Sequence, residues 1–324
     1  MQGGFYRYFC LILIFVSQTI NGSEWNIKCR FNEQNNNVFW TGEEISGFVE
    51  FINKDNSDLK FERIDADLIG EIVSQIPRTV NTTEEKTISN DIFLNDKILV
   101  HPLDKKGHFS IPYGIQSWPF SFQLNKHLPP SFDKDNNEIP KIRYFTRFSF
   151  IRSEWYKSNI HKIFPIFIKQ SARLLSTNRI LKEKTSRKGV RLLVTLEKNV
   201  VVAGNHLAFN VDLTNPKGAL MRRVSIIFTQ YVESKSNRKK EFKLTRQDLD
   251  KIKNLKDKHF NHTFYLPILS TIPATFSFHH EEHAVKVHYG LYFEVHLRGF
   301  FTSIHFEVPI VITNEMSQKD EGDD

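Results

Sequence analysis

The sequence predicts an all-β protein built as two tandem immunoglobulin-like β-sandwiches, and three observations lead to this class. The second half of the chain repeats the strand pattern of the first half. Apolar and polar residues alternate with period two along nearly every patterned stretch, as in strands with one buried face. Patterns of helical period are almost absent. At 324 residues the chain has room for two domains, each with its own core.

The repeat consists of five motif pairs that follow the same order in both halves. In the first pair, a glycine and an asparagine bracket an alternating strand at identical spacing, Gly42 to Asn53 and Gly204 to Asn215. The five pairs are residues 42–53 with 204–215, 63–68 with 223–228, 128–132 with 272–276, 142–150 with 287–295, and 164–168 with 308–312. Several matches in register and in order indicate two copies of one fold.

Individual strands follow from alternation and from the turn residues between them. Residues 285–297 place apolar side chains at every odd position, and residues 190–196 and 304–312 alternate in the same way. Asn-, Asp-, Pro- or Gly-rich turns separate the strands at 35–37, 53–56, 133–137 and 215–218. The best helical candidates are two short, highly charged stretches, 170–184 and 246–258.

These elements divide the chain into five parts. We expect a leader at 1–23, an N domain at 24–170, a linker at 171–188, a C domain at 189–314 and a short acidic tail at 315–324. The linker is placed in a polar, strand-poor stretch.

Indicators of the compartment disagree. Arg7 and the apolar run at 9–16 have the order of a secretory signal peptide, although a mis-assigned start or an extra strand would also account for them. Three glycosylation sequons, at Asn21, Asn81 and Asn261, are as many as this Asn-rich chain would show by chance. Only Cys10 and Cys29 are present, which favours a reducing compartment.

Charge narrows the class of partner. The net charge of +7 favours an acidic partner such as anionic lipid or a phosphorylated peptide. No recognition helix, zinc finger or RNP-like aromatic pair is present, so nucleic acid is not the expected partner.

The landmarks of the repeat resemble those of the arrestin superfamily, and the chain is similar to arrestin domain-containing proteins of the α-arrestin type. In the first half they include Gly42-Glu43, Trp118-Pro119-Phe120 and the run 128–132; in the second they include Val287-His288-Tyr289 and the run 308–312. The resemblance covers about residues 24–314. It implies a cytoplasmic adaptor, peripheral at the plasma membrane or endosomes, which binds membrane-protein cargo tails during endocytosis and sorting. The alternative is a secreted or lumenal ligand-binding protein with the same fold.

One family feature is missing from this sequence. α-Arrestins usually carry Pro-Pro-x-Tyr motifs that bind the WW domains of ubiquitin ligases. The Pro-Pro pair in this chain, Pro129-Pro130, is followed by Ser131-Phe132 and belongs to a fold-marking loop. Cargo or membrane binding is therefore the expected role, rather than direct recruitment of a ligase.

Two basic clusters are candidate binding sites. The run from Lys235 to Lys258 favours contact with anionic lipid or phosphate groups, since each engaged Lys or Arg is worth about 1 kcal/mol near an anionic membrane, although such a run is usually a solvated face. Its candidate contacts are Arg238, Lys239, Lys240 and Lys243. A second cluster, Arg143, Arg147 and Arg152, lies beside Trp155-Tyr156-Lys157 and is a candidate contact for an acidic cargo tail, with ordinary surface solubility as the alternative. Arg143 and Arg147 are odd-numbered, opposite in parity to Ile142 and Tyr144, so they should point outward.

Other motifs have simpler structural explanations. His279 and His283 would share a face only on a helix, so a solvated hairpin is expected in place of a metal site. Leu193–Glu197 matches a clathrin-box pattern, but its alternation predicts a core strand. Asp65 and Asp67 alternate with apolar residues and are expected on the solvent-exposed face of a strand. No nucleophile elbow, phosphate-binding glycine loop or recognisable carboxylate pair occurs, so neither catalysis nor a cofactor is expected.

Overall fold

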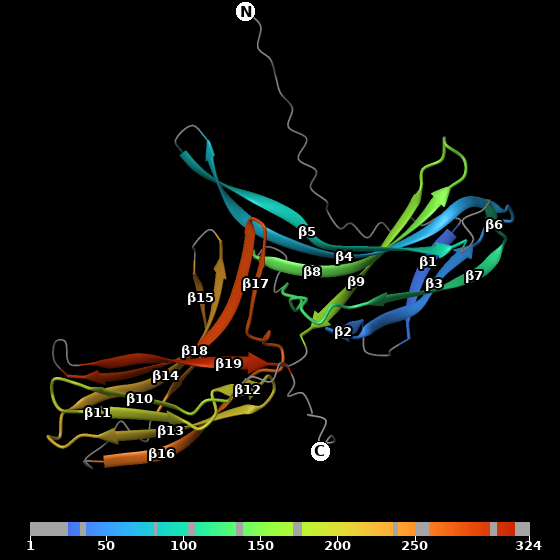
Figure 1. Ribbon diagram of the computed structural model, residues 1–324. Coiled ribbons are helices and arrows are strands. Elements are labelled where there is room, and N and C mark those ends of the chain that lie inside the picture. Colours follow the sequence, from blue (N-terminus) through green and yellow to red (C-terminus); the bar gives the residue numbers. More distant parts are fainter. Residues whose placement is uncertain are drawn as a thin grey trace, which may run out of the picture.

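A computed structural model describes residues 25–32, 37–80, 83–102, 108–133, 139–170, 177–235, 239–249, 259–298 and 303–314, and describes side chains outside 75–86. These residues form strands, turns and extended segments without a helix, which confirms the all-β prediction. Within them, no helix is long and apolar enough to cross a bilayer. Figure 1 shows two separate layered bodies, one from each half of the chain.

The N-terminal body is a sandwich of two sheets. A three-stranded sheet has the order β1-β3-β7, and a larger sheet has the order β2-β9-β8-β4-β5, with β6 paired to β4. The bounds are β1 Trp25–Phe31, β2 Val38–Trp40, β3 Glu44–Asn53, β4 Leu59–Val80, β5 Thr83–His101, β6 Phe109–Ile111, β7 Gly114–Gln123, β8 Lys141–Arg152 and β9 Ile160–Lys169.

The C-terminal body repeats this plan. Its smaller sheet has the order β10-β11-β13-β16, and its larger sheet has the order β12-β19-β18-β14-β15, with β17 paired to β18. The bounds are β10 Ile180–Thr185, β11 Arg191–Leu196, β12 Val200–Val202, β13 His206–Thr214, β14 Met221–Ser234, β15 Lys240–Asp248, β16 His259–Pro267, β17 Phe276–His280, β18 His283–Leu297 and β19 Ile304–Thr313.

Hydrogen bonds repeat along with the sheets. The buried Tyr144 hydroxyl donates to the Pro129 carbonyl oxygen at 2.6 Å, and the Tyr289 hydroxyl donates to the Pro273 carbonyl oxygen at 2.6 Å. Among the described strands, one pairing in each domain is parallel: β2 with β9 in the N domain and β12 with β19 in the C domain. The other pairings are antiparallel. The duplication seen in the sequence is therefore also a duplication of local chemistry.

The two helical candidates are wrong where the structure describes them. Residues 180–185, inside the expected linker, form β10, which pairs antiparallel with β11. Residues 246–248 form the end of β15. The rest of the second candidate, 250–258, and part of the first, 171–176, lie outside the described residues. Tertiary pairing satisfies the backbone of both charged segments as edge strands, so amphipathic periodicity is not needed to stabilise them.

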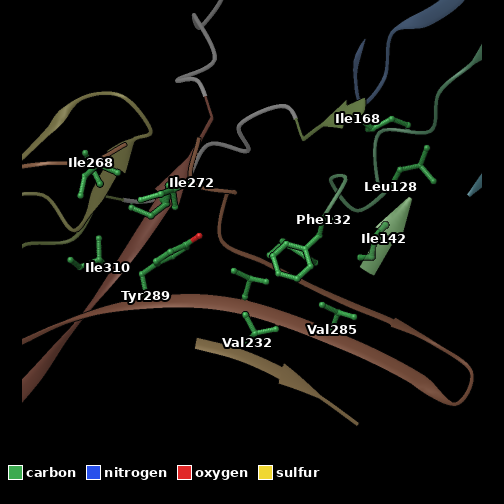
Figure 2. Close-up of a cluster of buried hydrophobic side chains, with 14 of the residues drawn as sticks. Leu128, Phe132, Ile142, Ile168, Val232, Ile268, Ile272, Val285, Tyr289 and Ile310 are labelled. Atoms are coloured by element: carbon green, nitrogen blue, oxygen red, sulfur yellow. The ribbon is translucent and has the colours of Figure 1, made fainter. Parts of the chain in front are cut away.

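Alternation along β18 matches the prediction. Its odd-numbered residues from His283 to Leu297 are buried. Those at the start of the strand face the N domain, as the bond from His283 to Ser74 shows, and the later ones belong to the C-domain core. The apolar cores of the two domains meet in one continuous cluster (Figure 2), where Phe132 and Ile142 of the N domain lie near Val232 and Val285 of the C domain. Buried apolar surface therefore holds the domains together.

Candidate functional site

The basic segment around β15 does not form one cationic face. The Lys239 ammonium lies 3.6 Å from the centroid of the Tyr231 ring, and Lys243 is exposed opposite Thr229 in the strand register. Lys240 is opposite Val232 and donates to the Ile139 carbonyl oxygen of the N domain at 2.8 Å. Successive side chains of a strand point to opposite faces, so the strand separates these lysines.

Lys240 therefore bonds across the joint between the domains, although its side chain is exposed and it remains a predicted lipid contact. Arg238 lies outside the described residues. β15 is the edge strand of its sheet, and lysines on such an edge discourage pairing with another chain. Lys239 and Lys243 remain predicted membrane contacts.

The three arginines of the second cluster also separate. Arg143 and Arg147 share the outer face of β8, as their odd numbering predicts. Arg143 is bonded to Asp133 at 2.8 Å, and Arg147 is bonded to Asp67 at 2.9 Å. Arg152 lies on the other side of the strand, with its guanidinium carbon 4.9 Å from the centroid of the buried Phe61 ring. The structure therefore does not bring Arg152 together with the other two.

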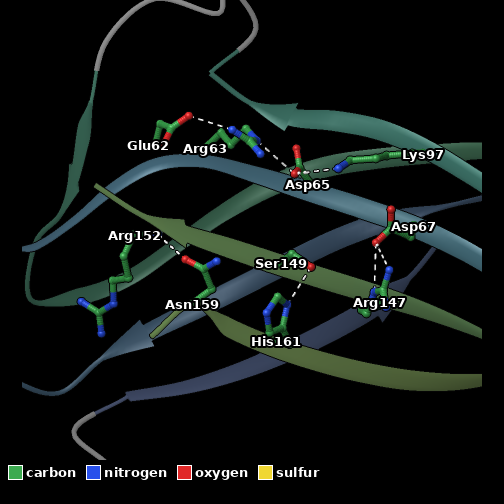
Figure 3. Close-up of polar contacts among 10 residues, drawn as sticks. All are labelled: Glu62, Arg63, Asp65, Asp67, Lys97, Arg147, Ser149, Arg152, Asn159 and His161. Carbon is green, nitrogen blue, oxygen red and sulfur yellow. Dashed lines mark hydrogen bonds and ion pairs between the residues drawn. The ribbon is translucent and has the colours of Figure 1, made fainter. Parts of the chain in front are cut away.

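The expectation that Asp65 and Asp67 are solvated is wrong. Both are about one-twentieth exposed, at 4% and 5%. Asp65 accepts from Arg63 and Lys97, each at 3.1 Å, while Asp67 faces Arg147 across the strand pair (Figure 3). Long basic side chains from the neighbouring strands cover these carboxylates, so alternation alone does not place them in water.

The turn between β8 and β9 carries two adjacent aromatic residues, Trp155 and Tyr156. Trp155 is 95% exposed and Tyr156 is 67% exposed. Lys157 pairs with Glu154 at 2.8 Å and lies 5.8 Å from the Tyr156 ring centroid. Two adjacent exposed aromatics at the tip of a hairpin are an apolar feature in contact with solvent, which needs a functional explanation. The sequence shows the two aromatics as neighbours, but no turn was predicted at this position.

The joint between the domains is built by the β17–β18 hairpin and the β4–β5 ribbon (Figure 1). Phe278 on β17 packs on Phe93 on β5, with ring centroids 4.9 Å apart. His283 Nδ1 is hydrogen-bonded to the Ser74 hydroxyl oxygen at 2.6 Å, and both residues are buried. The predicted solvated hairpin is therefore wrong for His283, although His279 is exposed. The N domain covers one side of this hairpin, which local sequence does not reveal.

Two further structural expectations are confirmed. Val194 and Leu196 of the clathrin-box pattern are fully buried on β11. The Pro129-Pro130 pair is buried in its loop, and the Pro129 carbonyl oxygen accepts the Tyr144 hydroxyl. Neither motif is available to a partner in this fold.

Burial affects several titratable groups of the two domains. It raises the pKa of the Cys29 thiol to about 12 and raises the pKa of Tyr144 and Tyr289. It also lowers the pKa of His288. Cys29 is the one free cysteine in the part of the chain that the structure describes, and its raised pKa makes it a poor nucleophile.

Comparison with protein families agrees with the duplicated sandwich. The family model of the arrestin (or S-antigen) N-terminal domain matches residues 27–170, and that of the arrestin (or S-antigen) C-terminal domain matches residues 186–316. No curated protein sequence matches the chain. The two domain matches cover most of the sequence, so this chain belongs to the arrestin superfamily.

Proposed function

We propose that this chain is a non-enzymatic adaptor of the α-arrestin type, which binds membrane-protein cargo tails and takes part in protein transport, endocytosis and sorting. The observation that carries the proposal is the pair of arrestin domains, because proteins of this family generally bind cargo proteins and are generally not enzymes. A pair of sandwiches presents surfaces for docking, and its loops are the usual place for binding residues.

We further propose that the β8–β9 hairpin contacts the membrane surface. The rings of Trp155 and Tyr156 are largely exposed, and their centroids lie 6.0 Å apart in an edge-to-face arrangement. Tryptophan and tyrosine favour the headgroup region of a bilayer, where the apolar part of the ring leaves water and the polar group stays hydrated. Arg152 and Lys157 flank the tip and add attraction to anionic lipid.

Co-sedimentation of the full chain with vesicles tests this contact. Vesicles of phosphatidylcholine with about one-third phosphatidylserine should bind the protein, because interfacial aromatics and basic residues act together. The W155S/Y156S variant should lose most of this binding, whereas Y265S, which removes an aromatic that is 65% exposed on β16, should not. Equal loss in both variants, or no loss in W155S/Y156S, would reject the hairpin as the contact.

The basic segment around β15 is tested in the same assay. R238E/K239E/K243E should weaken binding to phosphatidylserine vesicles, since each engaged charge contributes about 1 kcal/mol and reversing it removes more than that. Lys240 is left unchanged because it bonds across the joint. Unchanged binding would mean that these lysines only discourage pairing of the edge strand β15 with another chain.

Membrane topology in the native cell separates the adaptor from the secreted alternative. The cytoplasmic adaptor should be protease-accessible from the cytosol, should lack glycans and should be recovered partly with membranes. Asn261 lies exposed on β16, so it is accessible to a glycosyltransferase if the chain enters the secretory pathway. Glycans at Asn261, together with removal of residues 1–23, would reject the adaptor proposal in favour of a secreted or lumenal ligand-binding protein.

A further inference from the structure

Four acid and imidazole groups converge where the two domains meet. The Asp91 Oδ2 atom on β5 of the N domain lies 3.5 Å from His280 Nε2 at the end of β17. His283 Nε2, at the start of β18, lies 3.9 Å from the same oxygen. Ligand atoms of Asp91, His280 and Glu281 all lie within 4.8 Å of one another. We propose that this cluster is a zinc site shared between the domains, with Asp91, His280 and Glu281 as ligands and His283 as the fourth.

The donor set fits zinc. Imidazole nitrogen and carboxylate oxygen bind Zn²⁺ at about 2.0–2.2 Å in tetrahedral geometry, so neighbouring ligand atoms lie about 3.4 Å apart. The distance between Asp91 and His280 is already close to this spacing, at 3.5 Å. A side-chain rotation can bring Glu281 into place, because Glu281 is exposed and lies in a turn. His283 is buried, and its Nε2 atom must come closer to the Asp91 oxygen than 3.9 Å to act as the fourth ligand. Imidazole nitrogens bind borderline metals such as Zn²⁺ in preference to Ca²⁺ or Mg²⁺, which prefer oxygen ligands.

The surroundings orient the histidines as a metal site requires. A ligating histidine usually donates its second ring N–H to a fixed acceptor. The Ser74 hydroxyl oxygen, 2.6 Å from His283 Nδ1, can accept that proton and leave Nε2 with a free lone pair on the Asp91 side. The His280 ring lies near two phenylalanine rings, with its centroid 6.4 Å from that of Phe278 and 6.2 Å from that of Phe93.

Asp91 supplies a further sign, and the turn geometry shows which glutamate can reach the cluster. Asp91 Oδ2 is buried and accepts no hydrogen bond from the described residues, and such an oxygen is costly unless a cation satisfies it. Glu281 has a φ of 47°, which is a conformation that a two-residue hairpin turn requires. It forms a two-residue turn with Glu282, since His280 pairs with His283 across the hairpin. Glu282 is directed to Lys235, at 3.4 Å, which leaves Glu281 as the carboxylate of the turn that reaches the cluster.

This set of ligands differs from the pair that sequence spacing brought to attention. That pair was His279 and His283, whose side chains would share a face only on a helix. The structure instead pairs His280 with His283 across a tight turn, and a carboxylate from the other domain completes the set. A bound zinc ion would therefore connect the β4–β5 ribbon to the β17–β18 hairpin and restrict movement at the joint. This proposal is independent of cargo binding.

Zinc titration of the full chain, freed of metal with a chelator, tests the proposal. Competition against a chromogenic zinc chelator should show one tight site per chain, with at least tenfold weaker binding of Mg²⁺ or Ca²⁺. D91N, H280Q and E281Q should each weaken zinc binding by about 10-fold or more, and S74A by about 10–100-fold. E281Q is an exposed substitution and reports on the site even if D91N destabilises the joint.

Two controls come from the same hairpin. H279Q and E282Q alter an exposed histidine and an exposed acid at neighbouring positions, and both should bind zinc like the natural sequence. Absence of a tight site, or H280Q binding zinc as well as H279Q does, would overturn the proposal. Hydrogen exchange then tests the bridge, since zinc should slow exchange in both the hairpin and the β4–β5 ribbon. Protection confined to the hairpin, or tight binding that persists in D91N, would contradict a site shared between domains.

Discussion

The two domains share a framework but differ on the outer faces of their larger sheets. At matching positions in the strand registers, Asp67 lies opposite Arg147 in the N domain, and Ile227 lies opposite Tyr292 in the C domain. An ion pair on one sheet thus corresponds to an apolar pair on the other. The comparison teaches that the sandwich is specified by its inner faces, while the outer faces are free to diverge.

The domains also differ in the lengths of their ribbons. β4 and β5 have 22 and 19 residues, whereas the corresponding β14 and β15 have 14 and 9. The longer ribbon contacts the β17–β18 hairpin through Ser74, Asp91 and Phe93. At the centre of the joint, however, the residues that meet are equivalent in the repeat, since Phe132 packs edge-on against Phe276 with centroids 5.8 Å apart.

Disrupting this central pair should have the largest effect on stability. F132A and F276A should each lower the free energy of unfolding by about 3–5 kcal/mol, because each removes a buried aromatic ring. Urea denaturation measures both, with F48A as a control because Phe48 is 45% exposed. The double variant should show a coupling of about 0.5–1.5 kcal/mol, as expected for rings in contact. Strict additivity would mean that the two domains are not joined through this pair.

Transplanting the C-domain pair into the N domain tests whether the outer faces are interchangeable. D67N should cost about 1–3 kcal/mol, since it leaves Arg147 without its carboxylate, a loss moderated by the partial exposure of Arg147. D67I/R147Y, which reproduces the Ile227–Tyr292 pair, should stay within about 1 kcal/mol of the natural chain. A double variant less stable than D67N would show that the N-domain face requires its ion pair.

The repeated tyrosines provide a smaller test of equivalence. Y144F should cost about 1 kcal/mol through loss of the bond to the Pro129 carbonyl oxygen. Y289F should cost more, up to about 2 kcal/mol, because the Tyr289 hydroxyl also accepts from Gln230 at 2.7 Å. Urea midpoints of the two variants measure the difference. Equal costs would mean that the bond from Gln230 contributes nothing net.

The smallest effect is expected at Cys29, which has no counterpart in the C domain. With its pKa raised to about 12, the thiol should react with iodoacetamide much more slowly at pH 8 in the folded chain than in urea. The unfolded chain releases the proton at lower pH, so stability should fall as pH rises from the ordinary thiol pKa toward about 12. A C10S background confines labelling to Cys29. Equal labelling rates in both states would place Cys29 at the surface.

Much of the fold was predictable because it depends on local patterns. Alternation located β11, β18 and β19 and the residues that they bury. Numbering parity correctly placed Arg143 and Arg147 on the outer face of β8. The same rule failed for Asp65 and Asp67, because the basic side chains that cover them come from several strands.

The candidate site was less predictable. Lys240 was predicted to contact anionic lipid or phosphate, and its bond to a carbonyl oxygen of the other domain was not foreseen. Trp155 and Tyr156 were visible as adjacent aromatics beside Arg152, yet sequence alone does not distinguish an exposed hairpin tip from a packed one. The charged segment 180–185 lacked alternation and became a strand through pairing with β11.

The sequence by itself determined the two sandwiches, their order and their inner faces, since these depend on period-two alternation and turn residues within short windows. Only the tertiary structure decided which polar groups meet. His283 and Ser74 are 209 positions apart, and no local pattern connects them. Their contact depends on how the long ribbon of one domain packs on the hairpin of the other, because burial and hydrogen bonding are properties of surfaces brought together by the whole fold.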